Sequence, residues 1–393
     1  MKKPMFTRVC ANLLIGAGLF FVSNAAMGAP KYRAVLTVSG YTGTETLEGF
    51  PVLVRISESK ISGFSYADCA ENGADISFRG ADGRVLAHEI DTWDTSGESL
   101  VWVKLPTLAT NTTFTIHWKD KNPESSGTTN TWSNYVGVWH MGEESGTCAN
   151  SSPCGAKYDA VPKSKTQYNV RYTGADAPIG HARTTSSVDS GVTGYWNNGA
   201  RNYRSYLYVA SYHEENVGDT FTISSWVRVS DLVATDNNSY RIFSKKSVWN
   251  ASDGFEVEMS SSDTKFNART VWKEGTANED VNGSFPSLLK NWVHVAFVFS
   301  NSTLRVYGNG VKMTTSREAV TPVVENETFL AIGADATTVD GVQPHLIGAF
   351  DECRLMKGAA SADWVKAEYD AVNNADFVKA GSAKLAAMVI RLR

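Results

Sequence analysis

The stretch NWVHVAFVFSNSTLRVYGNGVKM, residues 291–313, decides the fold. Apolar residues alternate with period two in VHVAFVF and again in LRVY, which is typical of β-strands. The triplet Gly308-Asn309-Gly310 separates LRVY from VKM and favours a tight hairpin. The stretch therefore predicts antiparallel strands joined by short turns.

The same alternation continues through most of the chain after residue 30. It recurs in FPVLVRI (50–56), LVWVKLP (100–106), FTISSWVRVS (221–230) and HLIGAFDECRLM (345–356). Many short strands without interleaved helices predict an all-β fold of antiparallel sandwiches. The polar stretch at 119–131, KDKNPESSGTTNT, is the best candidate for a domain boundary.

One helix is expected near the end of the chain. Ser361 is a good N-cap, and an apolar stripe follows it at Trp364, Val365, Tyr369 and Val372. We expect this short helix to flank a sandwich.

Composition excludes several classes. A chain of 393 residues is too long for one ordinary domain, and 42% hydrophobic residues exclude wholesale disorder. A net charge of −4 gives no electrostatic reason to bind nucleic acid. Phosphate-binding glycine loops, dinucleotide fingerprints and GxSxG motifs do not occur in the sequence.

The N-terminus has the pattern of a signal peptide. Lys2, Lys3 and Arg8 precede an apolar run at 11–22 and a run of small residues at 25–29. We expect residues 1–28 to be removed on export, which places the mature protein outside the cell or at its surface. The apolar run falls short of the ~20 residues that span a bilayer, and no other segment of the mature chain approaches that length. Loss of its three cations would move the net charge from −4 to −7.

Four cysteines remain after this cleavage. Export permits disulfides, and Cys148 and Cys154 bracket the polar loop CANSSPC, so we predict that they pair. Cys69 and Cys353 either pair or stay as buried thiols, and the sequence leaves both alternatives open.

The second half of the chain resembles a known family. FTISSWVRVS, IFSKKS, the hairpin stretch at 291–313, FLAIGAD and GAFDECRLMKGAASADWVKAEYDA resemble, in order, the segments of the laminin-G-like, concanavalin A-type jelly roll. HMGEESG (140–146) resembles the segment that opens many bacterial members. The resemblance covers residues 132–378 and implies a jelly roll.

The first half resembles a bacterial surface-protein module known as domain of unknown function 2341. The matching residues are 71–108, which include HEIDTWD, followed by FTIHW (114–118). In that family the module commonly precedes a laminin-G-like domain. We therefore expect a β-sandwich at 30–125, the jelly roll at 132–378 and a short tail at 379–393.

HEIDTWD is the sharpest catalytic candidate, through Glu89, Asp91 and Asp94. Residues two apart on a strand share a face, and a carboxylate pair about 5–5.5 Å apart is what a retaining glycosidase needs. Laminarinase-like glucanases, which share the jelly-roll fold, carry a similar E-x-D-x-x-E strand. Here the last position is Asp94, and the segment lies outside the region that resembles the jelly roll. The alternative is an exposed acidic strand face.

The resemblance also implies a structural calcium ion. In jelly-roll relatives a late-strand Asp often binds calcium together with a residue near the first strand, and Asp351 and Glu143 stand at the matching positions. The alternative is that Asp351 accepts backbone hydrogen bonds at a strand end.

Aromatic and amide residues gather in YWNNGARNYR (195–204). Flat rings cover the apolar faces of sugars, and amide or guanidinium groups bond to their hydroxyls. The predicted sugar contacts are Tyr195, Trp196, Asn197, Asn198, Tyr203, Arg204, Trp249 and Trp272. We read Trp226, Trp292 and Trp364 as core residues and His140 as structural.

The sequence thus predicts an exported, non-catalytic protein that binds a glycan or polysaccharide, or a surface protein, with structural calcium as its only cofactor. Two other functions stay open: a glycoside hydrolase and a purely structural surface spacer.

Overall fold

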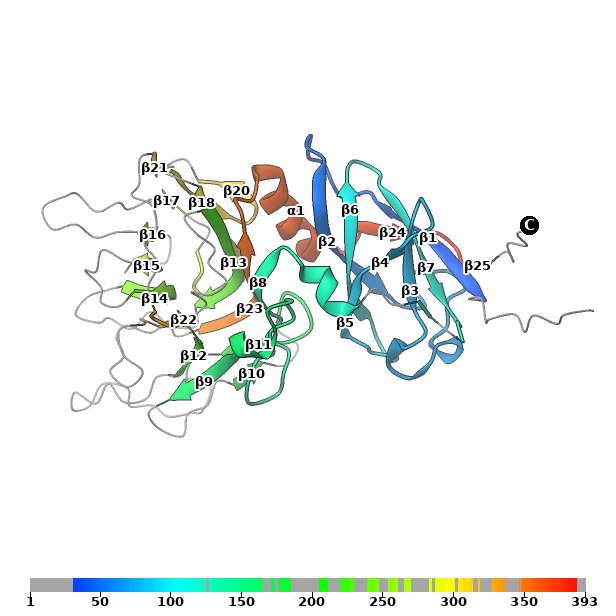
Figure 1. Cartoon of the computed structure of the whole chain (residues 1–393), viewed down its shortest axis with the longest axis horizontal. Helices are drawn as coiled ribbons and strands as arrows, with labels where there is room; N and C mark the ends of the chain where they lie inside the picture. The colour runs from blue at the N-terminus through cyan, green and yellow to red at the C-terminus, as the bar shows by residue number, and fades with distance from the viewer. Residues whose placement is uncertain are drawn as a thin grey trace, which may run out of the picture.

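The computed structural model describes residues 31–121, 123–124, 127–164, 171–173, 177–184, 205–210, 220–229, 239–246, 254–260, 265–269, 283–284, 287–300, 303–313, 317–318, 327–334, 336, 346 and 348–386. These residues form two β-modules that lie side by side, with helix α1 (Ala362–Asn373) between them (Figure 1). The predicted all-β class is confirmed.

The first module consists of two antiparallel sheets. One sheet has the order β24-β1-β7-β3-β4, with β25 also paired to β1, and the other has the order β2-β6-β5. The strands are β1 (Tyr32–Val38), β2 (Leu47–Ile56), β3 (Ser77–Gly80), β4 (Val85–Leu86), β5 (His88–Thr92), β6 (Ser99–Leu108), β7 (Thr113–Trp118), β24 (Val378–Ala380) and β25 (Lys384–Leu385).

The second module is the jelly roll. Its larger sheet has the order β10-β11-β23-β13-β18-β19-β20, with β8 paired to β23 and β21 to β19. These strands are β8 (Tyr135–Trp139), β10 (Arg171–Thr173), β11 (Ala182–Thr184), β13 (Thr220–Val229), β18 (Val293–Ser300), β19 (Thr303–Gly308), β20 (Val311–Lys312), β21 (Arg317–Glu318) and β23 (Gly348–Lys357).

The facing sheet of the jelly roll has the order β17-β16-β15-β14-β22-β12-β9. Its strands are β9 (Ala160–Ser164), β12 (Ser205–Val209), β14 (Ser239–Lys245), β15 (Phe255–Ser260), β16 (Lys265–Arg269), β17 (Gly283–Ser284) and β22 (Leu330–Ile332). Short 3-10 turns connect other elements: η1 (Tyr66–Asp68), η2 (Glu71–Gly73), η3 (Thr128–Trp132) and η4 (Gly155–Tyr158).

The predicted hairpin is confirmed. Only Asn309 and Gly310 join β19 to β20, with φ values of 49° and 75°, the left-handed values that a two-residue hairpin turn requires. Both faces of β18 are buried, each against a different core. Val295 and Phe297 pack into the core between the jelly-roll sheets, while Ala296 and Val298 belong to a second core that includes the first module.

Helix α1 connects the two modules. The Ser361 hydroxyl accepts a hydrogen bond from Trp364 N at 3.1 Å, which confirms the predicted N-cap. Trp364 contacts Phe50 of β2 edge-on, with ring centroids 4.9 Å apart, and Tyr369 stacks on Trp226 of the jelly roll. Among the described residues, no helix has the length and apolar character needed to cross a membrane.

The C-terminal segment returns to the first module. β24 pairs with β1 through Leu36–Ala380 to Val38–Val378, and β25 pairs Leu385 with Tyr32. Residues from both ends of the described chain therefore complete one sheet (Figure 1). The predicted domain boundary after residue 378 falls inside β24.

The predicted disulfide between Cys148 and Cys154 is corrected, because no bond joins these residues. The backbone of Cys148 pairs with Ala160, which fixes its buried side chain in the jelly-roll core. Cys154 instead stands at the start of η4, where a separate local turn sets its position. Cys69 and Cys353 are likewise not joined by a disulfide.

A buried histidine makes the first module sensitive to acid. Burial, with Arg79 and Arg33 nearby, lowers the pKa of His117 to about 4 from its ordinary value of 6.5. Its imidazole is neutral when folded and takes up a proton on unfolding, so its contribution to stability is complete above pH 6.5 and is lost as the pH falls toward 4.

We therefore expect His117→Gln to make the free energy of unfolding depend less on pH in the acidic range. Between pH 7 and pH 4.5 the wild-type free energy of unfolding should fall by about 2 kcal/mol more than that of the variant. Guanidinium unfolding at both pH values measures this difference. Equal losses in the two proteins would contradict the prediction.

Candidate functional site

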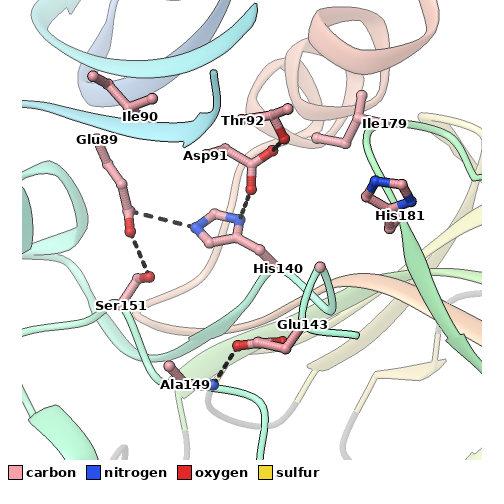
Figure 2. A pocket seen from close by; sticks show the side chains of 11 residues that line it. Glu89, Ile90, Asp91, Thr92, His140, Glu143, Ala149, Ser151, Ile179 and His181 are labelled. Carbon is pink, nitrogen blue, oxygen red and sulfur yellow. Dashed lines mark hydrogen bonds and ion pairs between the residues drawn. The ribbon is translucent and has the colours of Figure 1, made fainter. Parts of the chain in front are cut away.

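A pocket opens where the two modules meet. It encloses about 320 Å³ and is lined by Glu89, Ile90, Asp91, Thr92, His140, Gly142, Glu143, Ala149, Ser151, Ile179 and His181. Strand β5 of the first module supplies four of these residues, and loops of the jelly roll supply the others (Figure 2). The volume lies at the lower end of the range of small-ligand sites, about 300–1,000 Å³.

Two of the three predicted carboxylates enter the pocket. Glu89 and Asp91 both point toward His140 (Figure 2), although a register shift between Ile90 and Thr92 interrupts the regular alternation of β5. Asp94 does not line the pocket. It accepts hydrogen bonds from the backbone N and hydroxyl of Ser96 at 2.8 and 2.7 Å, and so stabilises the turn before β6.

His140 joins the two modules at the pocket floor. Its Nδ1 lies 2.8 Å from Glu352 Oε1 and 3.9 Å from Asp91 Oδ1, and its Nε2 lies 3.4 Å from Glu89 Oε2. Glu89 also accepts hydrogen bonds from Ser151 Oγ, at 2.6 Å, and from Trp132 Nε1. A residue that the sequence indicated as structural is thus the centre of the site.

A β-bulge brings Glu352 to this junction. Strand β23 pairs Arg354 with Ser224 but Asp351 with Trp226, so one extra residue is inserted, and Glu352 has a φ of 49°. Phe350 and Cys353 both enter the jelly-roll core although three positions separate them. The bulge therefore turns Asp351 and Glu352 together toward the other side of the sheet.

Arg354 lies behind the pocket and is almost completely buried. It donates hydrogen bonds to Glu352 Oε2 at 2.5 Å and to Glu368 Oε1 at 3.1 Å. Its guanidinium lies 4.3 Å from the ring centroid of Trp102 and 4.9 Å from that of Trp132. The guanidinium of Arg354 is thus held against the indole rings of Trp102 in β6 and Trp132 in η3.

The pocket shifts the pKa values of the two carboxylates of β5 in opposite directions. Burial alone would raise the pKa of Glu89, but His140, Ser151 and Trp132 outweigh it and hold the pKa below its ordinary value. Burial raises the pKa of Asp91 to about 6, against the opposing effect of His140. Burial would lower the pKa of His140, but Glu352 and Glu89 hold it well above 6.5.

The residues predicted to bind calcium are placed separately. Asp351 is fully buried; its Oδ2 accepts a hydrogen bond from Ile179 N at 3.2 Å, and its Oδ1 accepts none from the part of the chain that the structure describes. Glu143 accepts a hydrogen bond from Ala149 N, and its Oε2 lies 3.8 Å from the guanidinium of Arg183. A fixed positive charge beside Glu143 does not fit a calcium ligand well. Calcium binding stays a prediction.

The predicted sugar contacts fall outside the described residues. This applies to Tyr195, Trp196, Asn197, Asn198, Tyr203, Arg204, Trp249 and Trp272. Of the tryptophans read as core, Trp226 and Trp364 are buried, while Trp292 is only partly buried and lies against Arg228.

The sequence interpretation did not identify Ser151, His181, Glu352 and Arg354 as site residues. Glu352 adjoins the predicted Asp351, but strict alternation places the two on opposite faces. His140 opens the HMGEESG segment that carried the family resemblance, which was the one available signal for it.

Comparisons with known proteins agree with this architecture. Residues 202–366 match the family model of the concanavalin A-like lectin/glucanases superfamily, and residues 72–136 match that of a domain of unknown function, DUF2341. No curated protein matches the chain.

Solved structures of toxin binding domains are similar to part of the chain. The binding domain of Paraclostridial Mosquitocidal Protein 1 is 16% identical, with 61% of this chain and 53% of that chain covered and a TM-score of 0.43. The binding domain of botulinum neurotoxin DC, solved in complex with rat synaptotagmin II, is 14% identical, with 61% and 52% covered and a TM-score of 0.43. The chain spans about half the length of these proteins.

The two family matches follow one another along the chain in the order that the sequence predicts. The first lies in the first module and ends at Val136 of β8, and the second lies in the jelly roll and ends in α1. The chain therefore combines a DUF2341 module with a concanavalin A-like lectin/glucanase jelly roll.

Proposed function

We propose that this is an exported, non-catalytic carbohydrate-binding or adhesion protein that holds a saccharide in the pocket between its modules. The observation that carries the proposal is the lining of this pocket, which combines carboxylates, hydroxyls and imidazoles in a cavity of about 320 Å³. Sugar hydroxyls both donate and accept hydrogen bonds, and such a lining offers partners of both kinds. The superfamily of the jelly roll, which includes lectins, supports the same reading.

In this proposal the aromatic residues around Trp196, which lie outside the described residues, stay predicted sugar contacts. Export follows from the signal-peptide pattern of residues 1–28, and the partner is a polysaccharide outside the cell.

Gly142 offers a way to block the pocket without disturbing its hydrogen bonds. It lines the cavity, and a Cβ at this position would meet no atom within 4 Å. We expect Gly142→Phe to place a ring in the cavity and weaken saccharide binding by about 10-fold or more, because the ring excludes the ligand from a buried site. A glycan array, followed by titration of the best hit, measures this loss.

Gly142→Ala is the matched control and should bind like the wild type. Trp196→Ala tests the predicted aromatic contacts separately, and adding Ca²⁺ back after treatment with a chelator tests the calcium prediction. If the array stays blank for the wild type, or if Gly142→Phe binds normally, the pocket does not hold the saccharide. A blank array across many polysaccharides would favour the structural spacer.

A glycoside hydrolase is the second candidate. Glu89 and Asp91 lie on one strand and face the same cavity, and a pair of carboxylates flanking the bond is what glycosidases use. Release of sugar by the wild type, abolished by Glu89→Gln, would favour this candidate over a binding protein.

A further inference from the structure

Three potential metal ligands converge at the floor of the pocket. Asp91, His140 and Glu352 each offer one ligand atom, and these three atoms lie within 4.8 Å of one another. The closest pair, His140 and Glu352, is 2.8 Å apart, and His140 and Asp91 are 3.9 Å apart. Ligand atoms that share one tetrahedral zinc ion at about 2.0–2.2 Å are about 3.3–3.6 Å apart, and the two printed separations lie on either side of this value.

The remaining polar atom of each ligand is held by another residue. His140 Nε2 faces Glu89, the second oxygen of Glu352 accepts from Arg354, and the second oxygen of Asp91 accepts from Thr92 Oγ1 at 3.1 Å. Metal-binding histidines typically donate their other ring N–H to a carboxylate, and metal-binding carboxylates are themselves hydrogen-bonded. The three ligand atoms thus face one another, while the other polar atom of each side chain is held by a neighbouring residue.

Carboxylates outnumber cations around these atoms. Among the described residues, His140 and Arg354 are the cations in contact with the cluster, against the carboxylates of Glu89, Asp91 and Glu352. Asp351 is fully buried, and its Oδ1 has no hydrogen-bond partner among the described residues. Excess negative charge in a buried site is costly, and a divalent cation would neutralise it.

We propose that Asp91, His140 and Glu352 bind a divalent transition-metal ion of the Zn²⁺ type between the two modules. One nitrogen and two carboxylate oxygens suit zinc, and the imidazole makes the set a poor match for calcium. Binding replaces the proton on His140 Nδ1, which passes to solvent. Asp91 and His140 line the pocket, so a fourth coordination position faces the cavity, where a ligand oxygen would complete the shell.

The test is calorimetric titration of the chelator-treated full chain with Zn²⁺ alone. We expect one equivalent of Zn²⁺ to bind at the triad, and Asp91→Asn to weaken its binding by at least about 10-fold because an amide oxygen carries no charge. Glu89→Gln, which changes the partner of His140 Nε2 and leaves the three ligands in place, should weaken it by about 10- to 100-fold. No saccharide is present, so the outcome is independent of the proposed glycan binding.

Asp94→Asn is the matched control, since it removes the same charge three residues away on a group that only stabilises a turn. All variants keep the same cysteines, so any ion bound by thiols appears equally in each. Near-UV circular dichroism checks that Asp91→Asn is folded. The proposal is overturned if the wild type binds no more Zn²⁺ than Asp91→Asn, or if Ca²⁺ displaces Zn²⁺ at equal concentration.

Discussion

Arg354→Met should lower the free energy of unfolding by about 3–5 kcal/mol, because it removes one partner of a buried ionic network. Glu352 and Glu368 would keep their carboxylates in the interior without the cation that now lies between them. The methionine fills much of the space between the two indole rings, so lost packing contributes less than lost charge. Guanidinium unfolding, in the presence of a chelator, measures the change.

Lys366→Met is the matched control. Lys366 forms an ion pair with Asp370 on the surface of α1, and exposed pairs of this kind contribute at most about 1 kcal/mol. The double variant Arg354→Met/Glu368→Gln should recover part of the loss, because it no longer leaves that carboxylate buried without its cation. A loss below about 1 kcal/mol in Arg354→Met would show that water reaches the network.

The second large effect is expected for Trp364→Ala, which should lower the free energy of unfolding by about 3–5 kcal/mol. Trp364 is 8% exposed and packs its ring against Phe50 of the first module, in a core cluster that continues to Trp226 of the jelly roll. Removing the ring leaves a cavity at the place where the two modules share apolar contacts. We therefore expect the wild type to unfold in one transition and the variant in two, as followed by calorimetry.

Val311→Ala is the control for this experiment. Val311 is 62% exposed on β20, beside the same helix, and its truncation should change stability by less than about 0.5 kcal/mol. A single transition in Trp364→Ala, with little loss of stability, would mean that the modules are coupled through the ionic network and not through the helix.

Local patterns in the sequence predicted the elements well. Asn309-Gly310 predicted the hairpin because few other residues tolerate two successive positive φ values. Ser361 predicted the start of α1, and the spacing of Glu89 and Asp91 predicted that they share a face. Each of these inferences depends on residues a few positions apart, where steric and hydrogen-bonding rules act directly.

The site could be predicted only in part, because it is assembled by docking. His140 and Ser151 meet Glu89 from positions 51 and 62 residues away in the chain. No local pattern encodes that approach. Glu352 was missed for a different reason: a bulge shifts the alternation of β23 by one residue, and the sequence around it, AFDECRL, contains no glycine that would mark the irregularity.

The pairing of β25 with β1 has a mechanical consequence for a protein that would work under tension. Ala386 N donates to Lys31 O at 2.9 Å, so the two ends of the described chain lie next to each other on neighbouring antiparallel strands. A pull applied at these two positions would unzip the pair from Tyr32–Leu385 toward Val38–Val378, one hydrogen-bonded pair after another. The jelly roll and its pocket would carry none of the load until β24 and β25 had separated from β1.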